Sequence, residues 1–238
     1  MPHLHALRYV LEGSFCSFRN PIGAKYQATF WFPPKTTVVG FLGCALGLDP
    51  TDLEPLYDSL KVGVVLESWG GSARDLWGFT KLKGSAKPEN AVVIRELIYK
   101  PCYVFYIASN ENQQLEELRE ALLDPAYPLR FGRGEDLAML RGKPEVISLS
   151  PVDDPPWLRW TLLPSALQDI ECTLEPLNTG SRLDRPPLPA QMPIRFRYDK
   201  NWVRKAEMIS VTQIFDWGVR PTSPERLWTD GRYTIYLI

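Results

Sequence analysis

Apolar and polar residues recur along the first 150 residues with the two periods that separate strands from helices. Alternation or a continuous apolar run predicts a strand, and apolar residues three and four apart predict a helix. Strands are expected at 3–12, 61–67, 91–108 (broken at Pro101), 128–131 and 145–150, and helices at about 37–46, 50–60 and 111–123. The main elements therefore follow the order strand, helix, strand, strand, helix, strand. This is the order of a ferredoxin-like domain, which RNA-recognition-motif (RRM) domains share.

The first strand and the first helix carry the most detailed side-chain pattern. The residues of strand 3–12 expected to face the core are Leu4, Ala6 and either Tyr9 or Val10. Thr36 or Thr37 is expected to cap the helix, which ends at Gly47. Gly40, Gly43 and Gly47 share one helix face, and each disfavours a helix by about 1 kcal/mol relative to alanine. We expect another backbone to approach this face closely, or the helix to pack tightly on the sheet.

The remaining residues predict an inserted hairpin and a second domain. Residues 68–90 are rich in glycine, carry two tryptophans and are basic on balance, which favours a finger-like β-hairpin. After residue 150 the chain is punctuated by prolines, with strand-like segments at 158–163, 194–198 and 232–238. We expect an α+β fold: a ferredoxin-like or RRM-type domain over residues 1–150, with the insert at about 68–90, and a smaller β-rich domain over residues 151–238.

Composition narrows the class of protein but does not indicate a function. The chain has 45% hydrophobic and 23% charged residues and a net charge of -1, as an ordinary globular protein does. Its four cysteines lie far apart with no C-x-x-C pair, so we expect reduced thiols, no zinc cluster and no cofactor. We find no secretory signal and no apolar stretch of the roughly 18 residues that a membrane span needs. We therefore expect a cytoplasmic protein that does not associate with membranes.

The charges are distributed unevenly along the chain. Residues 61–100 contain seven basic and four acidic residues, and residues 182–205 contain seven basic and two acidic ones. The helix at 111–123 is acidic instead. This division predicts one face for the phosphates of a nucleic acid and another for a protein partner. The alternative is that the charges are scattered and solvated.

Aromatic and basic residues are interleaved in two loops. Single-stranded RNA is bound by stacking bases on flat side chains while cations hold the backbone. The residues of this kind are Phe15, Phe18, Arg19, Lys25 and Tyr26 in the first loop, and Trp69, Arg74, Trp77, Phe79, Lys81 and Lys83 in the insert. We expect Trp69, beside Gly70 and Gly71, to contact RNA. Trp77 is the better candidate for a place in the core.

Three further segments are candidate phosphate sites. A helix N-terminus attracts anions through its free N–H groups and its dipole, and here Lys35, Thr36 and Thr37 add donors. Arg130 and Arg133 flank a glycine turn, and Arg195 and Arg197 lie in the basic segment near the C-terminus. An ordinary capped helix and an ordinary turn are the alternatives.

A catalytic centre has little support in the sequence. The only histidines, His3 and His5, lie in the first strand, and no G-x-S-x-G or H-E-x-x-H motif is present. General acid–base catalysis needs a positioned proton carrier, and the sequence offers no convincing one. We therefore expect a binding protein rather than an enzyme.

Three segments together resemble the Cas-five family of CRISPR-associated proteins, within the RAMP superfamily. They are FRNP at 18–21, FPPKTTVVGFLGCALGL at 32–48 and YPLRFGRGEDL at 127–137. The resemblance implies a ferredoxin-like domain whose hairpin acts as a thumb. It also implies a non-catalytic subunit of a type I Cascade-type complex that holds the 5′ handle of the crRNA. The implied partners are that RNA, a Cas-seven backbone subunit and a large Cas-eight-type subunit, with target DNA near the PAM contacted indirectly.

Two alternatives stay open beside this resemblance. In the I-C branch of the family, a tyrosine, lysine and histidine cluster cuts precursor crRNA, and Tyr26, Lys25 and His5 are conceivable counterparts. The chain would then be a metal-independent endoribonuclease. A generic interaction domain with no RNA role is the second alternative. The type I subtype is open, with I-B or I-A favoured, and a transposon-associated complex is also compatible with the sequence.

Overall fold

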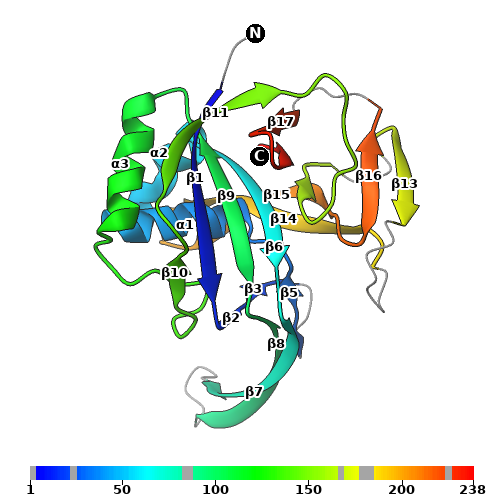
Figure 1. Ribbon diagram of the computed structural model, residues 1–238. Coiled ribbons are helices and arrows are strands. Elements are labelled where there is room, and N and C mark those ends of the chain that lie inside the picture. Colours follow the sequence, from blue (N-terminus) through cyan, green and yellow to red (C-terminus); the bar gives the residue numbers. More distant parts are fainter. Residues whose placement is uncertain (1–3, 22–25, 82–87, 166–168, 177–184, 223–226) are drawn as a thin grey trace.

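A computed structural model describes residues 4–21, 26–81, 88–165, 169–176, 185–222 and 227–238. It has a mixed α/β fold in which strands predominate over helices (Figure 1). The main sheet consists of β1 (Leu4–Gly13), β6 (Lys61–Ser68), β9 (Cys102–Ala108), β10 (Ala138–Leu140), β11 (Glu145–Pro151), β17 (Leu227–Thr229) and β18 (Thr234–Tyr236). Its strands follow the order β18-β17-β11-β1-β9-β6, with β10 paired to β1. All of these pairs are antiparallel.

Helices cover one face of this sheet. They are α1 (Lys35–Leu46), the short 3-10 helix η1 (Pro50–Leu53), α2 (Glu54–Ser59) and α3 (Asn112–Leu123). The side chains of β1 that pack in the same core as α1 and α3 are Leu7, Tyr9 and Leu11. The Tyr9 ring stacks on Phe105 of β9, with 5.0 Å between ring centroids. Burial of these aromatic and aliphatic side chains supplies most of the free energy that holds helices to sheet.

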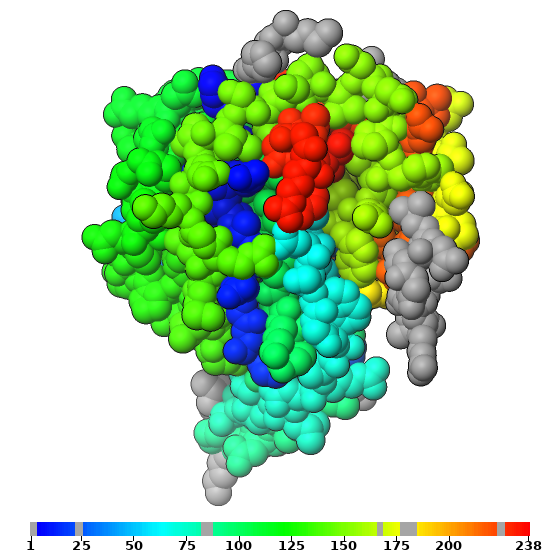
Figure 2. All heavy atoms as spheres, viewed as in Figure 1, coloured from blue at the N-terminus to red at the C-terminus, as the bar shows by residue number. Residues whose placement is uncertain are grey.

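The opposite face of the sheet is covered by the end of the chain. Ala6, Val65 and Val104 form a second apolar cluster with Ile235 of β18. The chain end also pairs with β6, because the backbone groups of Val62 and Ile238 exchange hydrogen bonds of 2.9 and 3.0 Å. The C-terminal strands are therefore part of the packing of the main sheet, and Figure 2 shows them, in red, lying against β1 and β6.

Of the two residues offered for the first strand, Val10 and not Tyr9 shares the cluster of Leu4 and Ala6. Ala6 lies in the cluster under the C-terminal strands, whereas Tyr9 lies in the core under the helices. Because successive side chains of a strand point to opposite faces, Ala6 and Tyr9 cannot share one. Both faces of β1 are covered, so its apolar residues do not alternate in the way that a half-exposed strand shows.

A long β-hairpin projects beyond the ends of β1 and β6 (Figures 1 and 2). It consists of β7 (Gly71–Lys81) and β8 (Glu89–Tyr99), which pair from Gly71–Tyr99 to Lys81–Glu89. Two short strands, β2 (Phe15–Cys16) and β4 (Tyr26–Gln27), pair with β8 near its base. The expected break of 91–108 at Pro101 is confirmed, since β8 ends at Tyr99 and β9 (Cys102–Ala108) begins just after it, but the first part belongs to the hairpin. A continuous apolar run does not reveal which partner each part pairs with.

Smaller sheets formed by the second half of the chain complete the fold. Strands β12 (Leu162–Leu163), β15 (Arg204–Gln213) and β14 (Leu188–Tyr198) form one sheet, and β13 (Cys172–Pro176) pairs with β16 (Trp217–Pro221). Near the start of α1, β3 (Phe18–Arg19) pairs with β5 (Thr29–Phe30). The strand expected at 128–131 is absent: the segment forms only an isolated bridge between Arg130 and Leu137. The long β14–β15 hairpin reaches across to α1 and α2.

The ends of α1 decide what its first turn can bind. The N-cap is Pro34 and not Thr36 or Thr37, and no side chain caps the helix. Gly47 ends the helix in the left-handed conformation, with φ of 76°, as expected. A β-carbon at Gly43 would overlap Cδ2 of Leu53 in η1, whereas one at Gly40 would meet nothing within 4 Å. The close approach at Gly43 is therefore made by a side chain and not by another backbone.

Alanine at these two glycines should have opposite effects on stability. Gly40→Ala should raise the free energy of unfolding by about 0.5–1 kcal/mol, because alanine favours a helix and the added methyl has room. Gly43→Ala gains the same helix propensity but overpacks Leu53, which typically costs about 1–3 kcal/mol, so we expect a net loss of about 1 kcal/mol. Urea unfolding of both variants measures the difference. Equal effects of the two substitutions would contradict this packing.

Candidate nucleic-acid interface

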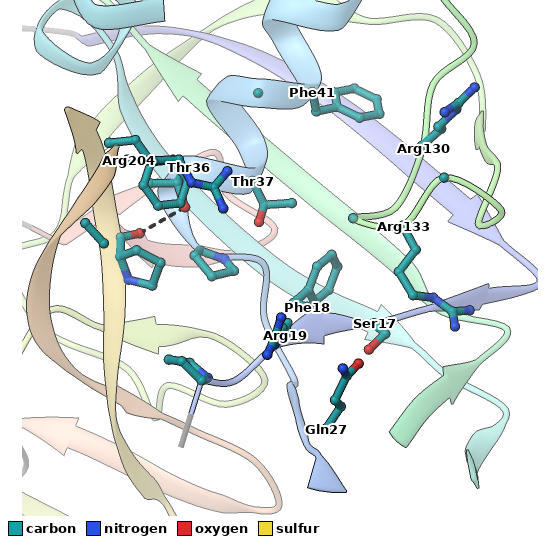
Figure 3. Close-up of a pocket in the computed structure, with 18 of the residues that line it drawn as sticks. Ser17, Phe18, Arg19, Gln27, Thr36, Thr37, Phe41, Arg130, Arg133 and Arg204 are labelled. Atoms are coloured by element: carbon teal, nitrogen blue, oxygen red, sulfur yellow. Dashed lines mark hydrogen bonds between the residues drawn. The ribbon is translucent and has the colours of Figure 1, made fainter. Parts of the chain in front are cut away.

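A groove of about 870 Å³ lies between the start of α1, β3, the loop after α3, the β7–β8 hairpin and the β14–β15 hairpin (Figure 3). Its lining contains five arginines and one carboxylate, that of Glu135. The arginines are Arg19, Arg95, Arg130, Arg133 and Arg204. Segments that are distant in the sequence thus contribute positive charge to one concave surface. Such a surface selects an anionic ligand.

Two of these arginines are held by carboxylates in the wall of the groove. Arg133 donates from Nε and Nη2 to the two oxygens of Asp136, each at 2.5 Å, and Asp136 is buried. Arg95 donates to Asp75 at 2.6 Å and to Glu135 at 3.0 Å. Because Arg95 and Asp75 lie on the hairpin and Glu135 lies in the loop after α3, these ion pairs hold the hairpin against the loop. Bidentate and charge-assisted bonds of this kind fix geometry as well as adding energy.

The pKa of Glu135 is lowered in this arrangement. Its own backbone N–H makes the largest contribution, and the charges of Arg133 and Arg95 add to it. The carboxylate therefore stays ionised at neutral pH and offsets part of the charge of those two arginines. What remains to attract a ligand comes from the other three arginines.

Arg19, Arg130 and Arg204 are exposed and form no ion pair with any residue that the structure describes. Figure 3 shows Arg130 on the loop at one side, Arg204 on β15 at the other, and Thr36 and Thr37 of α1 between them. The Arg204 guanidinium lies 4.3 Å from the ring centroid of Phe196, which keeps the side chain extended over an apolar support. These three cations are available to an external anion.

The N-terminal part of α1 also borders the groove. Thr36, Thr37 and Gly40 line it, and the Thr36 hydroxyl donates to the carbonyl of Pro193 on β14 at 3.4 Å. The first turn holds no acidic residue, and Pro34 offers no side-chain acceptor to its N–H groups. The helix dipole therefore acts on whatever occupies the groove. The open space over Gly40 lets a ligand come close to the helix backbone.

The model of the CRISPR-associated protein family (Cas_Cas5) matches residues 6–183 of the 238-residue chain. The chain belongs to the Cas5 family. No curated protein sequence matches it. A chain of a CRISPR RNA-guided surveillance complex is similar in fold, with a TM-score of 0.57, 13% identity and 91% of each chain covered. A crystal structure of a Cas protein aligns at a TM-score of 0.42 with 20% identity, covering 90% of this chain and 95% of the other.

The fold of this Cas5 chain brings together five of the residues that the sequence singled out. They are Arg19, Thr36, Thr37, Arg130 and Arg133, and all line the groove. Arg74 and Lys81 lie elsewhere on the hairpin: Arg74 is 5.9 Å from the ring centroid of Tyr26, and Lys81 is 5.8 Å from that of Phe79. Lys25 and Lys83 lie outside the described residues.

The two tryptophans of the insert have exchanged the places expected for them. Trp69 packs edge-on against Trp31, with 4.8 Å between centroids, and both rings lie about 4.4 Å or less from the Arg185 guanidinium. Asp216, which is buried, accepts a bond from Nε of Arg185 at 3.4 Å. Trp69 is therefore part of an internal cluster. Trp77 is 39% exposed and lines the groove.

In the β14–β15 hairpin, the groove-lining residues are neighbours of the ones expected. Arg195 forms an ion pair with Asp58 of α2, and Arg197 pairs with Glu207 at 3.8 Å. Phe196 and Arg204 line the groove instead. A strand turns alternate residues to opposite faces, so an error of one position selects the wrong face. The pairing of β14 with β15 would have identified the face, but no local signal in the sequence gives it.

Lys35 begins α1 but does not line the groove. It is half-buried near Arg195 and Lys61, and its pKa falls to about 8, mainly through desolvation and then through those two charges. A second group of cations thus lies behind the helix, where it adds to the positive potential without a direct contact to a ligand.

Replacing Lys35 should therefore stabilise the fold at neutral pH. The folded state disfavours the charged amine, whose pKa is about 8 there against 10.5 normally. Since the unfolded chain holds the proton between those values, wild-type stability rises with pH across this window. Lys35→Met should be more stable at pH 7, by about 1 kcal/mol after allowance for solvent screening, and this advantage should shrink by pH 10.5. Urea unfolding at both pH values tests this prediction. Lys35→Arg is the control, because arginine stays charged at both pH values and the variant should not gain the stability that wild type gains by pH 10.5.

A difference in free energy of unfolding between Lys35→Met and wild type that stays constant with pH would contradict the lowered pKa of Lys35. A Lys35→Arg variant with the same free energy of unfolding as wild type at pH 10.5 would also contradict it, because arginine retains the charge that the folded state disfavours.

The described residues give no sign of a metal centre. Among them, no group of three or more His, Cys, Asp or Glu side chains is placed to hold a metal ion. The four cysteines, Cys16, Cys44, Cys102 and Cys172, are all free thiols. None of the described helices is long and apolar enough to cross a membrane.

The histidine and tyrosine considered for RNA cleavage lie far apart. His5 is near the start of β1, whereas Tyr26 pairs with Ile94 in the projecting hairpin. The eight steps of β1 from His5 to Gly13 alone span roughly 26 Å at about 3.3 Å per residue. His3 and Lys25 lie outside the described residues. His5 and Tyr26 thus cannot act on the same phosphodiester in this conformation.

Proposed function

We propose that this Cas5 protein is a non-catalytic subunit of a type I Cascade-type interference complex that binds and caps the 5′ handle of the crRNA. The observation that carries the proposal is the groove beside α1, where Arg19, Arg130 and Arg204 have no counter-charge among the residues that the structure describes. A folded protein rarely gathers unpaired cations in one concavity unless an anion binds there, because their mutual repulsion is unfavourable.

A single-stranded nucleic acid fits the groove better than a small anion does. The lining places flat apolar surfaces, Trp77 and Phe196, beside the cations, and bases stack on surfaces of this kind. The three exposed arginines come from β3, from the loop after α3 and from β15, so they can contact successive phosphates of one strand. RNA is the member of this class that family membership favours.

The proposal extends to the fold and to the hairpin. The strand order β11-β1-β9-β6, with α1 after β1 and α3 after β9, supports a ferredoxin-like domain of RRM type. The β7–β8 hairpin would be the thumb, closing over the RNA from the side where Trp77 and Arg95 face the groove. Its ties to Glu135 would hold it at a fixed distance from the loop that carries Arg130.

Protein partners would bind other faces. The acidic face of α3, with Glu116, Glu117 and Glu120, is suited to a basic partner surface and not to RNA. We propose that a Cas-seven backbone subunit and a large Cas-eight-type subunit flank this chain, which would help to start the backbone. Target DNA near the PAM would be contacted only through them. A cytoplasmic location follows from this role.

Absence of cleavage is part of the proposal. The separation of His5 from Tyr26 supports it, because both would be needed at one phosphodiester in a metal-independent endoribonuclease. Processing of precursor crRNA would then be the task of another protein.

The exposed arginines should govern the affinity for handle RNA. We expect Arg19→Ala, Arg130→Ala and Arg204→Ala each to weaken binding of the host's 5′-handle RNA about tenfold, as loss of a charge-assisted contact does. Each should also make the slope of log K against log salt concentration shallower by about 0.7, because one fewer phosphate is neutralised. Fluorescence anisotropy with labelled RNA at several salt concentrations measures both quantities, and the same samples on a gel report cleavage.

Arg119→Ala is the control, since Arg119 is partly exposed on α3, outside the groove, where it pairs with Glu116 and Glu120. It should leave the affinity unchanged. Arg133→Ala is unsuitable as a test, because it would leave Asp136 buried without its partner and unsettle the loop. Unaltered affinity in all three groove variants would refute the proposed site, and defined cutting of the RNA beside its handle would refute the non-catalytic role.

A further inference from the structure

A tryptophan stands exposed at the tip of the β14–β15 hairpin. Trp202 is 73% exposed and has a φ of 61°, a left-handed conformation that side chains other than glycine and asparagine rarely adopt. The turn is firmly built: Asp199 Oδ1 accepts from the N–H groups of Asn201 at 2.9 Å and Val203 at 3.1 Å. The N–H of Trp202 donates to the Asp199 carbonyl at 2.9 Å. The turn therefore holds the indole in one strained position away from the core.

Packing does not explain this conformation. Trp160 also has a positive φ, 53°, but its ring lies within the aromatic cluster around Arg185. Trp202 has no such compensation, since most of its ring faces solvent. A bulky residue in a strained conformation without packing is a common feature of binding sites, where the strain presents the side chain to a ligand.

The surface beside Trp202 continues from the groove. A second hollow of about 320 Å³ is lined by Trp202, by the end of β14 and by residues 50, 51 and 54 at the start of the helical segment. Phe196 lines both this hollow and the arginine groove, so the two meet at β14. Arg197 and Lys200 contribute positive charge to the hollow, and Glu54 and Asp199 contribute negative charge.

The hairpin as a whole has a positive balance. Residues 188–213 contain five basic residues and two acidic ones. Three of the basic residues form ion pairs: Arg195 with Asp58, Arg197 with Glu207 and Lys205 with Asp199. Asp199 is occupied with the turn, where the N–H groups of Asn201 and Val203 lower its pKa. A negatively charged strand leaving the groove would therefore meet Arg204 and then Lys200, which form no ion pair with any described residue, before it reaches the indole. An aromatic face at the end of a basic track is the arrangement that binds a nucleobase by stacking.

We propose that Trp202 stacks on an unpaired nucleobase of the RNA strand as it leaves the arginine groove. This rests on the proposed function, because it needs a strand in that groove. The site takes any flat base, since stacking does not read hydrogen-bonding edges, and the neighbouring Lys200 contacts its phosphate. It lengthens the RNA track of this subunit from the start of α1 to the tip of the β14–β15 hairpin.

The test compares two handle RNAs, one that fills the groove and one with three added nucleotides at each end. Wild type should bind the longer RNA more tightly. Trp202→Ala should lose about tenfold in affinity for the longer RNA, as loss of one stacked base predicts, and little for the shorter one. Val203→Ala, a change at the next exposed position of the same turn, should bind both as wild type does.

A folding control comes from the strained backbone. Trp202→Gly should retain or raise Tm, because glycine adopts the left-handed conformation freely, while losing the same affinity as Trp202→Ala. Loss of binding in a variant of equal or higher Tm cannot be ascribed to unfolding.

Four outcomes distinguish base stacking by Trp202 from the alternatives. Selective loss for the longer RNA in both Trp202 variants supports the inference. Wild-type affinity of Trp202→Ala for the longer RNA overturns it while leaving the arginine groove in place. Unchanged RNA affinity with impaired assembly of the multi-subunit complex also overturns it, and assigns Trp202 to a protein partner. Failure of wild type to bind either RNA refutes the proposed function, and this inference with it.

Discussion

The buried carboxylate of Asp136 is the constraint on which the candidate site depends. A carboxylate with so little access to water needs a fixed counter-charge, and Arg133 supplies it through two parallel hydrogen bonds. This pair sets the path of the loop after α3, and Glu135 in that loop then holds Arg95 of the hairpin. The hairpin is thereby held against the loop, and the position of Arg130 follows from that loop.

The same constraint divides the arginines of the groove into two kinds. Arg95 and Arg133 have their charge compensated within the wall, so they shape the surface more than they attract a ligand. Arg19, Arg130 and Arg204 have no compensation from the described residues and provide the attraction. A count of basic residues in the sequence cannot make this distinction, because it depends on which carboxylates the fold places beside each guanidinium.

The sequence predicted the order of the main elements and the end of α1 at Gly47, since both follow from local periodicity and local turn chemistry. It left open whether Tyr9 or Val10 shares a face with Ala6, and it gave no sign that β8 belongs to the hairpin, because apolar runs do not identify their pairing partners. Arg19, Arg130 and the first turn of α1 could be anticipated from their motifs as candidate anion contacts, and all of them line the groove. Phe196 and Arg204 could not, because only the register of β14 against β15 turns them, rather than Arg195 and Arg197, toward the groove.

The central claim, that this groove holds the 5′ handle, is tested most directly by photo-cross-linking. A crRNA with 4-thiouridine at successive handle positions would be assembled with the full complex, irradiated, and the cross-linked peptides identified by mass spectrometry. The account predicts adducts in peptides containing residues 17–21, 127–136 and 204–208 of this chain, with the RNA otherwise intact. Adducts confined to the acidic helix α3, or to other subunits, would contradict it.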